Sequence, residues 1–352
     1  MKKVLITGSS GLVGSECLEF FHKKKFKIYA LDNDYRSKFF GKASSTLRVK
    51  KFQRENFKNV EFINKNLLSF TFLEDFFKNI KFDLIIHTAA QPSHDWSAND
   101  PILDYKVNAL ATIYLLELAR KYSPDTVFIH TSTNKVYGDR PNSLIGLKEL
   151  SKRYEVFRKG KRFSINEEMS IDNSMHSPFG ASKTSADISV QEYGKYFGIK
   201  SGIFRCGCIT GPNHQGAELH GFLSYLTKCM VQNKSYNIYG YKGKQVRDNI
   251  HSKDLTNMFW QYYLNPGYGE VYNAGGGRNN SISILEAIDK INHLANLKWN
   301  KFKIEKKARN GDHIWYITDF TKFTKKFPSW KLEYSNEQII EQIIDKFRSI
   351  SK

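Results

Sequence analysis

The sequence predicts an α/β protein with a doubly wound parallel sheet and a smaller C-terminal lobe. Short apolar runs typical of buried strands alternate with amphipathic helical patterns from Lys3 to about Arg205. A glycine-rich turn follows the first strand, and after Arg205 the alternation weakens. We therefore expect two domains, a sheet domain of residues 1–211 with 245–282 and a smaller lobe of residues 212–244 with 283–352.

Length and composition predict a globular, cytoplasmic protein. The chain has 352 residues, 40% of them hydrophobic, which is enough for a large core. It has no apolar run of about 18 residues that would cross a membrane, and Met1-Lys2-Lys3 leads directly into a strand pattern, unlike a signal peptide. Its four cysteines form neither a disulfide framework nor a zinc-ligand pattern, so we expect a reducing environment and no bound metal.

A net charge of +19 suggests an anionic partner. The lysines are scattered, with small clusters at 23–25 and 148–162, and neither a zinc finger nor an RNA-recognition signature accompanies them. We therefore expect a solvated basic surface and a small anionic substrate, with no nucleic acid and no membrane as a partner.

The turn after the first strand has the pattern of a phosphate-binding loop. Lys3–Thr7 reads as a buried strand and residues 15–23 as a helix. Glycines spaced as they are between these elements allow a tight turn, close approach of the backbone and close packing of the helix, whose N-terminus then holds a pyrophosphate. The residues of this run that we expect at a cofactor are Gly8, Gly11, Leu12, Val13 and Gly14.

The second strand, Phe26–Leu31, ends in Asp32-Asn33, and both residues are candidates for binding a cofactor. The Asp32 carboxylate is placed to accept the two ribose hydroxyls of an adenosine and would repel a 2′-phosphate, so the pattern favours NAD over NADP. Arg36 is a cation that would suit a 2′-phosphate. An ordinary turn with a solvent-facing Asp32 is the structural alternative.

The next segments continue the alternation of strands and helices. Residues 39–58 are polar and basic and predict a helix and a loop, whereas Val60–Ile63 predicts a third strand. Asn66 and Leu67 follow that strand, and we expect them near the adenine. Residues 73–79 have a helical pattern.

The fourth strand, Asp83–Ala90, ends in small residues, as is needed where backbone passes beside a cofactor. We therefore expect Ala89 and Ala90 at the cofactor. The loop 91–96 that follows is polar, contains an aromatic residue and His94, and is expected at the lip of a site.

Three hydroxyl side chains end the fifth strand. An amphipathic helix, Asp104–Lys121, contains Asn108 and leads to the strand Thr126–His130, which is followed by the run Thr131–Thr133. Open α/β sheets bind their ligands at the carboxyl ends of strands, so this run predicts a ligand contact, with a purely structural role as the alternative.

Ser177 followed by Pro178 predicts the start of a helix that ends near Phe197, because a hydroxyl caps free N–H groups and the proline ring has helical φ. One member of its inward stripe is a lysine. A buried ammonium is costly, so such a residue reaches the surface, pairs with a partner or serves a site. The stripe, at spacings of four and three, is Phe179, Lys183, Ala186, Val190, Tyr193 and Phe197.

The later segments predict the smaller lobe and the last strands of the sheet. Residues 144–168 are basic and irregular and read as an insertion or flap. The further elements expected are strands at 200–205, 236–239, 243–251 and 270–273, and helices at 221–233, 252–264, 283–295 and from about 336.

Together these pieces resemble the extended short-chain dehydrogenase/reductase family, which has a Rossmann sheet, in its branch of nucleotide-sugar epimerases and dehydratases. The resemblance covers nearly the whole chain. It rests on Gly8-x-x-Gly11-x-x-Gly14, Asp32, Asn108, Thr131–Thr133, the Lys183 helix, Arg247-Asp248 and Arg309-x-Gly311-Asp312.

Three runs are similar to those of the tyvelose epimerases, also called CDP-paratose 2-epimerases. They are longer than the general family motifs. They are Ser132-Thr133-Asn134-Lys135-Val136-Tyr137-Gly138-Asp139, His176-Ser177-Pro178 with Gly180-x-Ser182-Lys183, and Gly243-Lys244-Gln245-Val246-Arg247-Asp248.

The resemblance implies roles for individual residues. Thr133 stands where the family binds the reacting sugar hydroxyl, with Asn134 beside it in the substrate site. Lys183 stands where the family lysine holds the nicotinamide ribose, and Asn108 is implied at the cofactor. Further substrate contacts are implied for Cys208, which stands in place of an Asn, and for Arg247 and Arg309, whose guanidinium forks suit a diphosphate.

Phe179 departs from the family pattern. The family has a catalytic tyrosine four residues before its lysine, and a phenyl ring cannot take or give a proton. Another group replaces it, the chemistry differs, or the chain binds NAD and a nucleotide sugar without turnover. His176 and His94 are the first candidates for the catalytic role, followed by Tyr137, Cys208 or a water held by Thr133.

The resemblance therefore implies an NAD-dependent nucleotide-sugar epimerase that oxidises C-2 of a CDP-dideoxyhexose transiently and returns the hydride to the other face. A 4-epimerase or a 4,6-dehydratase is the nearest rival, although Asn134-Lys135 replaces the acidic residues usual in dehydratases. A non-catalytic binding protein is the third alternative. Relatives pair through two helices, here Asp104–Lys121 and Pro178–Phe197, which implies a homodimer or homotetramer.

Overall fold

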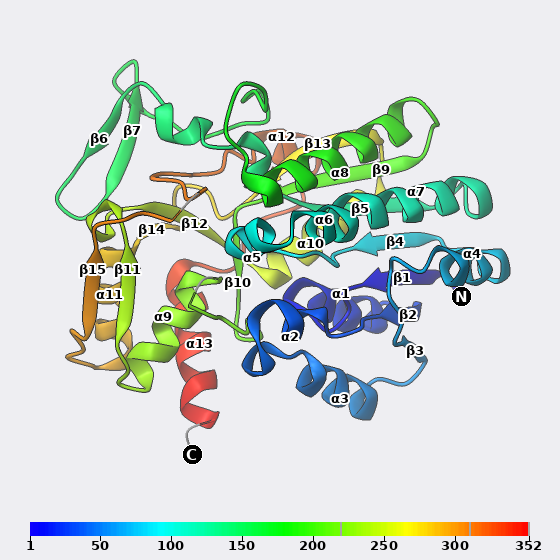
Figure 1. Ribbon diagram of the computed structural model, residues 1–352, viewed down its shortest axis with the longest axis horizontal. Helices are drawn as coiled ribbons and strands as arrows, with labels where there is room; N and C mark the ends of the chain where they lie inside the picture. Colours follow the sequence, from blue (N-terminus) through cyan, green and yellow to red (C-terminus); the bar gives the residue numbers. More distant parts are fainter. Residues whose placement is uncertain (219, 310, 351–352) are drawn as a thin grey trace. The chain divides into compact units, whose positions relative to one another are not determined.

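A computed structural model describes residues 1–218, 220–309 and 311–350, and the chain divides into two compact units (Figure 1). The first unit contains Met1–Val136, Ser177–Arg205 and Thr256–Tyr272, and the second contains Tyr137–His176, Cys206–Leu255 and Asn273–Lys352. The predicted boundaries differ from this division, because residues 137–176, 206–211, 245–255 and 273–282, which we expect in the sheet domain, belong to the second unit.

A seven-stranded sheet with the order β13-β9-β5-β4-β1-β2-β3 forms the centre of the first unit. Strands β3, β2, β1, β4 and β5 pair in parallel, and this confirms the predicted doubly wound fold. The order reverses beside β1, where such sheets open a crevice at their carboxyl ends. The strands are β1 Lys3–Thr7, β2 Lys27–Leu31, β3 Val60–Ile63, β4 Leu84–His87, β5 Val127–Thr133, β9 Lys200–Cys206 and β13 Tyr268–Ala274.

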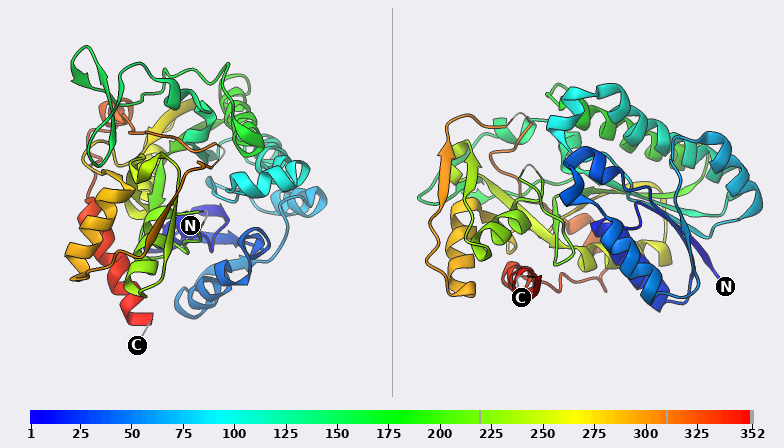
Figure 2. Two further views of the ribbon diagram at one scale, coloured as in Figure 1. Left: turned by 60° about the vertical axis from the view of Figure 1, so that its left-hand side comes forward. Right: turned by 60° about the horizontal axis from the view of Figure 1, so that its bottom comes forward.

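Helices pack on both faces of this sheet (Figure 2). On one face Leu73 of α4, Leu115 of α7 and Val190 of α8 form a core with sheet residues such as Phe128. The opposite face carries α1 and α10, where the Phe21 ring packs edge-on against Trp260 at 6.0 Å. The helices are α1 Leu12–Lys23, α2 Tyr35–Phe40, α3 Leu47–Asn56, α4 Phe70–Asn79, α5 His94–Asn99, α6 Pro101–Tyr105, α7 Ala111–Tyr122, α8 Ser177–Lys195 and α10 Ser252–Leu264.

The predicted helix Asp104–Lys121 is divided in the structure. Asp100 caps the short helix α6 through the N–H of Leu103, and a π-helical turn, Lys106–Leu110, separates α6 from α7. Such turns recur at functional sites. Here the turn contains Asn108, one of the predicted cofactor residues.

The second unit consists of small sheets and helices. The helices α9, α11 and α13 share a hydrophobic core with β11, and Ser283 and Glu286 form a capping box at the start of α11. The predicted insertion 144–168 contains a small antiparallel sheet in which Leu147 pairs with Val156. The elements are β6 Leu147–Glu149, β7 Tyr154–Arg158, β8 Lys161–Arg162, β10 Cys208–Thr210, α9 Phe222–Val231, β11 Tyr236–Tyr239, β12 Val246–His251, β14 Ser281–Ser283, α11 Ile284–Ala295, β15 Phe302–Glu305, α12 Thr321–Lys326 and α13 Asn336–Ile350.

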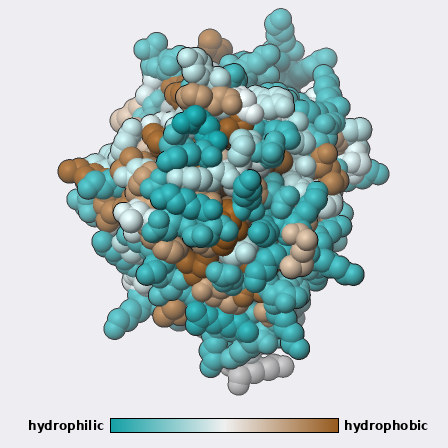
Figure 3. Space-filling view, turned by 90° about the vertical axis from the view of Figure 1, so that its right-hand side faces the viewer, coloured by the Kyte–Doolittle hydropathy of each residue, from teal (hydrophilic) through white to brown (hydrophobic). Residues whose placement is uncertain are grey.

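The surface seen in Figure 3 is mostly hydrophilic, with small hydrophobic areas between the polar side chains. This agrees with a chain in which 25% of the residues are charged. Within residues 1–218, 220–309 and 311–350, no helix is both long enough and apolar enough to span a bilayer.

Asp254 of the second unit gives a testable pH dependence. It is buried, accepts the backbone N–H groups of Glu333 and Tyr334, and burial raises its pKa from 3.8 to about 6. Between these pH values the folded state binds more protons than the unfolded state, so this group's contribution to stability falls as the pH rises. We expect the free energy of unfolding of the wild type, relative to Asp254→Asn, to fall by about 2 kcal/mol between pH 4 and 6. Urea denaturation across this range checks this, and a difference independent of pH would contradict it.

Candidate functional site

The glycine loop brings backbone from three places together at the carboxyl end of β1. Gly8 has φ of +68°, and its N–H donates to the Leu31 carbonyl at 2.8 Å. A Cβ atom on Gly14 would lie 2.1 Å from the Gly8 carbonyl oxygen, and one on Gly8 would lie 2.9 Å from Cα of Ala89. Only glycine fits both positions, because the neighbouring atoms are backbone.

The N-terminus of α1 fits a pyrophosphate. Gly11 is its N-cap residue and supplies no side-chain hydrogen bond, so the first N–H groups, beginning at Leu12 and Val13, are not capped by a side chain. Ser9 in the same loop is buried, and its Oγ has no hydrogen-bond partner among the residues that the structure describes. An anion at this helix end would satisfy these donors and interact favourably with the helix dipole.

Asp32 lies at the carboxyl end of β2, as the sequence predicts, and is 8% exposed. Its carboxylate accepts the Ser10 N–H at 3.0 Å and the Asp34 N–H at 2.8 Å, which orients it beside the glycine loop. Asn33 follows it, half-buried, and accepts the Tyr35 N–H. The arrangement suits a carboxylate that receives ribose hydroxyls.

Arg36, the cation that suits a 2′-phosphate, lies with its guanidinium 4.8 Å from the centre of the Phe40 ring. Burial lowers its pKa to about 10, so it stays charged at neutral pH. This contact with an aromatic ring lies within α2.

Helix α3 supports the glycine loop in a way that sequence reasoning missed. The Gln53 amide donates to the Ser9 carbonyl at 2.8 Å and accepts the Ser10 hydroxyl at 3.2 Å. Lys50 Nζ donates to the Asp32 carbonyl at 3.0 Å, and burial lowers the pKa of this lysine. The sequence pattern that could have identified these residues is the spacing of four and three between Thr46, Lys50 and Gln53. All three are buried on one face of the helix.

Two other predicted pairs of cofactor residues lie beyond the ends of β3 and β4. Asn66 donates to the Tyr35 hydroxyl at 2.9 Å, and Leu67 is buried in the core. Ala89 donates its N–H to Thr7 Oγ1 at 3.3 Å, and Ala90 beside it is half-buried. Both pairs come after the carboxyl ends of their strands, and the glycine loop comes after the carboxyl end of β1 in the same sheet.

Asn108 lies in a buried hydrogen-bond network. Its Oδ1 accepts the Gln91 N–H, and its Nδ2 contacts the Gln91 carbonyl, Asp104 Oδ1 and Ser182 Oγ at 3.0–3.1 Å. Its side chain is 1% exposed, and burial raises the pKa of the neighbouring Asp104. We infer that Asn108 holds the backbone that follows β4 and thereby acts on a cofactor through that loop.

His87 of β4 is a neutral, structural histidine. Thr112 donates its hydroxyl to the Asn108 carbonyl at 2.7 Å, so its oxygen accepts the Nε2–H of His87 at 3.0 Å, and Thr7 then donates to Nδ1 at 2.7 Å. Burial, and next the charge of Lys183, lower the pKa of His87 to about 3. This chain fixes the tautomer of His87 and joins α7 to β1.

Lys183 is 3% exposed and reaches the end of β5. Its Nζ donates to the Thr131 carbonyl at 2.9 Å and lies 3.4 Å from Nε2 of His130. Burial, and next the charge of Lys183, hold the pKa of His130 well below its usual value, so this imidazole is neutral. The buried ammonium is therefore held by a strand end, at the edge of the sheet where ligands bind.

The hydroxyl side chains of Ser132 and Thr133, at the end of β5, have different roles. Ser132 donates to Asp187 at 2.6 Å, and Asp187 forms a buried ion pair with Arg205 at 2.8 Å, so Ser132 has a structural role. Thr133 is half-buried and accepts the Lys135 N–H at 3.2 Å. Asn134, next to it, is buried. Thr133 therefore remains the candidate for a substrate contact.

His94 lies against Phe179, whereas His176 belongs to the second unit. The His94 and Phe179 rings meet edge-on with centroids 5.0 Å apart, and His94 Nδ1 lies 2.8 Å from Ser177 Oγ. His176 directs its Nδ1 to the Ser174 carbonyl at 2.8 Å. Of the two histidines predicted as catalytic candidates, the first unit thus brings His94 to the residue that lacks the hydroxyl.

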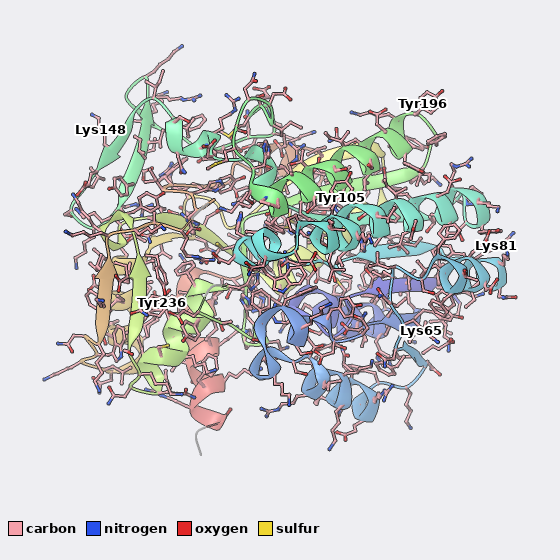
Figure 4. All side chains as sticks on the ribbon, in the orientation of Figure 1. Lys65, Lys81, Tyr105, Lys148, Tyr196 and Tyr236 are labelled. Carbon is pink, nitrogen blue, oxygen red and sulfur yellow. The ribbon has the colours of Figure 1, made fainter. Side chains whose placement is uncertain are left out.

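The predicted substrate residues of the second unit lie on its strands and loops. Arg247 of β12 lies 3.5 Å from Asp312, and Cys208 of β10 pairs with Asn249 on the same strand as Arg247. The charge of Arg309 reaches Tyr236 of β11, which is labelled in Figure 4. Arg247 thus lies beside a carboxylate of the same unit.

Comparisons with known proteins agree with this geometry. The chain is 27% identical to the CDP-paratose 2-epimerase of Salmonella typhi over 99% of its own length and 100% of the relative's. It is 31% identical to the dTDP-D-glucose 4,6-dehydratase of Dictyostelium discoideum over 84% of the chain and 62% of that relative. Its fold matches the UDP-glucuronic acid 4-epimerase of Bacillus cereus, solved with UDP-glucuronic acid and NAD, with a TM-score of 0.78, 24% identity and 99% of each chain covered.

Residues 4–275 match the NAD dependent epimerase/dehydratase family. This range includes the glycine loop, Asp32, the end of β5 and Lys183, so the match and the site cover the same part of the chain. The chain belongs to the NAD dependent epimerase/dehydratase family.

Proposed function

We propose that the protein is an NAD-dependent nucleotide-sugar epimerase that acts at C-2 of a CDP-dideoxyhexose such as CDP-paratose. The observation that carries the proposal is the buried Lys183 ammonium, which is held at the end of β5 within the same sheet edge as the glycine loop. The full-length similarity to a CDP-paratose 2-epimerase supports the choice of sugar and position.

The residues of the first unit would bind and orient the reactants. The N–H groups at the start of α1 would hold the pyrophosphate of NAD, Asp32 would accept the ribose hydroxyls, and Lys183 would hold the nicotinamide ribose. When bound, NAD supplies the acceptor for the hydride and then returns it. Thr133 would orient the sugar hydroxyl that is oxidised.

The second unit would bind the nucleotide diphosphate through Arg247 and Arg309, with Cys208 near the sugar. A charge-assisted hydrogen bond contributes about 1.5–3 kcal/mol, or roughly 10–100-fold in affinity. We therefore expect Arg247→Met to raise the KM for the nucleotide sugar by about 10–100-fold with a smaller effect on kcat, measured by steady-state kinetics. Arg120→Met removes an exposed guanidinium that pairs with Glu117 and should leave KM unchanged. A larger change in kcat than in KM for Arg247→Met would contradict a binding role.

A 4-epimerase or a 4,6-dehydratase is the rival on the same fold, and Asn134-Lys135 after Thr133 argues against elimination. A non-catalytic NAD and nucleotide-sugar binder is favoured only by Phe179.

Purified protein incubated with CDP-paratose should form CDP-tyvelose, detected by NMR because the two epimers have equal mass. No product, together with turnover of another nucleotide sugar, would contradict the substrate. Binding of NAD and sugars without any turnover would favour the binding protein.

We also propose that the protein forms a homodimer or homotetramer through α6, α7 and α8. Ile102 and Tyr105 are 70% and 49% exposed, and on α8 Ile188 is 43% exposed; Tyr105, whose hydroxyl lies 3.0 Å from Ser185 Oγ of α8, is labelled in Figure 4. Such a group of exposed apolar side chains suits a second copy of the same helices.

We expect Tyr105→Lys with Ile188→Lys to convert the assembly to a monomer, because each copy would then place unpaired charges in the apolar contact. Light scattering coupled to size-exclusion chromatography measures the mass. Leu47→Lys changes an apolar side chain of α3 that is 57% exposed and is the matched control. A double variant with the mass of the wild-type assembly would contradict this interface.

A further inference from the structure

The proposed epimerisation needs a proton acceptor in the first unit, because oxidation of a hydroxyl releases a proton as well as a hydride. His87 and His130 are buried imidazoles with lowered pKa values, held on β4 and β5. His22 lies at the other end of α1, where its Nε2 contacts the Lys58 carbonyl. His94 is half-buried and is the first residue of α5, which follows β4 at the ligand-binding edge of the sheet.

His94 and Ser177 form a hydrogen-bonded pair at the start of α8. His94 Nδ1 lies 2.8 Å from Ser177 Oγ, and the Ser177 oxygen also accepts the Gly180 N–H at 3.3 Å. Ser177 has φ of +61°, which is uncommon for a residue with a side chain and places its hydroxyl toward α5. A hydroxyl whose oxygen already accepts an N–H has its own proton available for the imidazole.

Phe179 forms the apolar side of this pair. Its ring is 6% exposed and meets the His94 ring edge-on at 5.0 Å. Its backbone N–H donates to Ser97 Oγ at 3.1 Å, which joins α8 to the same short helix that carries His94. The aromatic ring thus holds the imidazole in place without being able to take a proton.

We propose that Ser177 and His94 together accept and return the proton of the sugar hydroxyl in the epimerisation. This rests on the proposed function. As the C–H electron pair leaves with the hydride to NAD, the O–H bond of the sugar breaks and its C=O bond forms. Ser177 Oγ takes that proton and passes its own proton to Nδ1 of His94, which becomes an imidazolium. The proton returns by the same route when the hydride comes back, so no other oxidant or base is consumed.

The pair requires a particular tautomer of His94. Nδ1 accepts from Ser177 only when the neutral ring carries its proton on Nε2. Histidine labelled with ¹⁵N distinguishes the two tautomers by NMR, and His94→Gln assigns the signal. We expect the Nε2–H form in the wild type and a changed tautomer population in Ser177→Ala, with the His22 signal unchanged. A wild-type His94 protonated on Nδ1, or one insensitive to Ser177→Ala, would overturn the pair.

The kinetic test follows hydride transfer by the absorbance of NADH in a single turnover with CDP-paratose. We expect His94→Gln and Ser177→Ala to slow the transfer by about 10²–10⁴-fold. Adding Phe179→Tyr to His94→Gln should restore much of the loss, because a phenol then stands beside the vacated position. His22→Gln should match the wild type.

Each other outcome is decisive. Wild-type rates in both His94→Gln and Ser177→Ala would overturn the pair while leaving the proposed epimerase intact. An inert wild type that Phe179→Tyr activates would show a site that lacks its proton acceptor and would also overturn the pair. A protein inert toward nucleotide sugars with and without Phe179→Tyr would overturn the proposed function, and this inference with it.

Discussion

Lys183→Met is expected to lower kcat by about 10²–10⁴-fold, with little loss of folding stability. The ammonium is the group that the end of β5 holds through the Thr131 carbonyl, and a methionine has no charge to replace it. Methionine has a similar length and an apolar, flexible chain, so the stripe on the inner face of α8 stays filled. Steady-state kinetics and thermal unfolding measure the two effects separately.

Lys195→Met is the matched control, since this lysine lies on the same helix, is exposed and donates to Gln191 Oε1 at 3.3 Å. Its kcat should equal that of the wild type. Lys183→Met should also purify with less NAD, quantified after release from the protein. Unchanged turnover and NAD content in Lys183→Met would contradict the role of Lys183 in catalysis and in binding NAD.

Asp187→Ala is expected to destabilise the first unit by about 3–5 kcal/mol, because it removes the carboxylate that faces a buried guanidinium. Asp187 is fully buried and receives two hydrogen bonds from Arg205, at 2.8 and 3.1 Å, in addition to that of Ser132. The three residues join α8, β9 and β5. Urea denaturation followed by circular dichroism measures the change in the free energy of unfolding.

We expect Asp187→Ala also to disturb the position of Thr133 in the site. Ser132, which donates a hydrogen bond to Asp187, immediately precedes Thr133. Glu192→Ala, an exposed carboxylate on the same helix, should change stability by less than about 0.5 kcal/mol. If Asp187→Ala cost no more than Glu192→Ala, the ion pair would not be what fixes β5 against α8.

The parts of the site that lie at strand ends were predictable from the sequence. Buried parallel strands are continuous apolar runs, so β1 was placed at Lys3–Thr7 and the glycine loop and Asp32 followed directly. The position of Lys183 in an apolar stripe also signalled a partner. These features are local in sequence, which is why spacing alone reveals them.

Other features depend on contacts that no local pattern encodes. The spacing of Lys50 and Gln53 places them on one face of a helix, but only the packing of α3 on the glycine loop buries them. The π turn that contains Asn108 depends on its buried network. The sequence could not choose between His94 and His176, because His94 precedes its partner Ser177 by 83 positions and their contact is tertiary.

The proposed reaction oxidises C-2 of a nucleotide sugar and returns the same hydride to it. CDP-paratose labelled with deuterium at C-2 tests this directly when it is incubated with the protein in ordinary water. The expected product is CDP-tyvelose that retains the deuterium at C-2, seen by NMR, because the hydride stays within the site. Product with hydrogen from water at C-2 would contradict transient oxidation at this carbon.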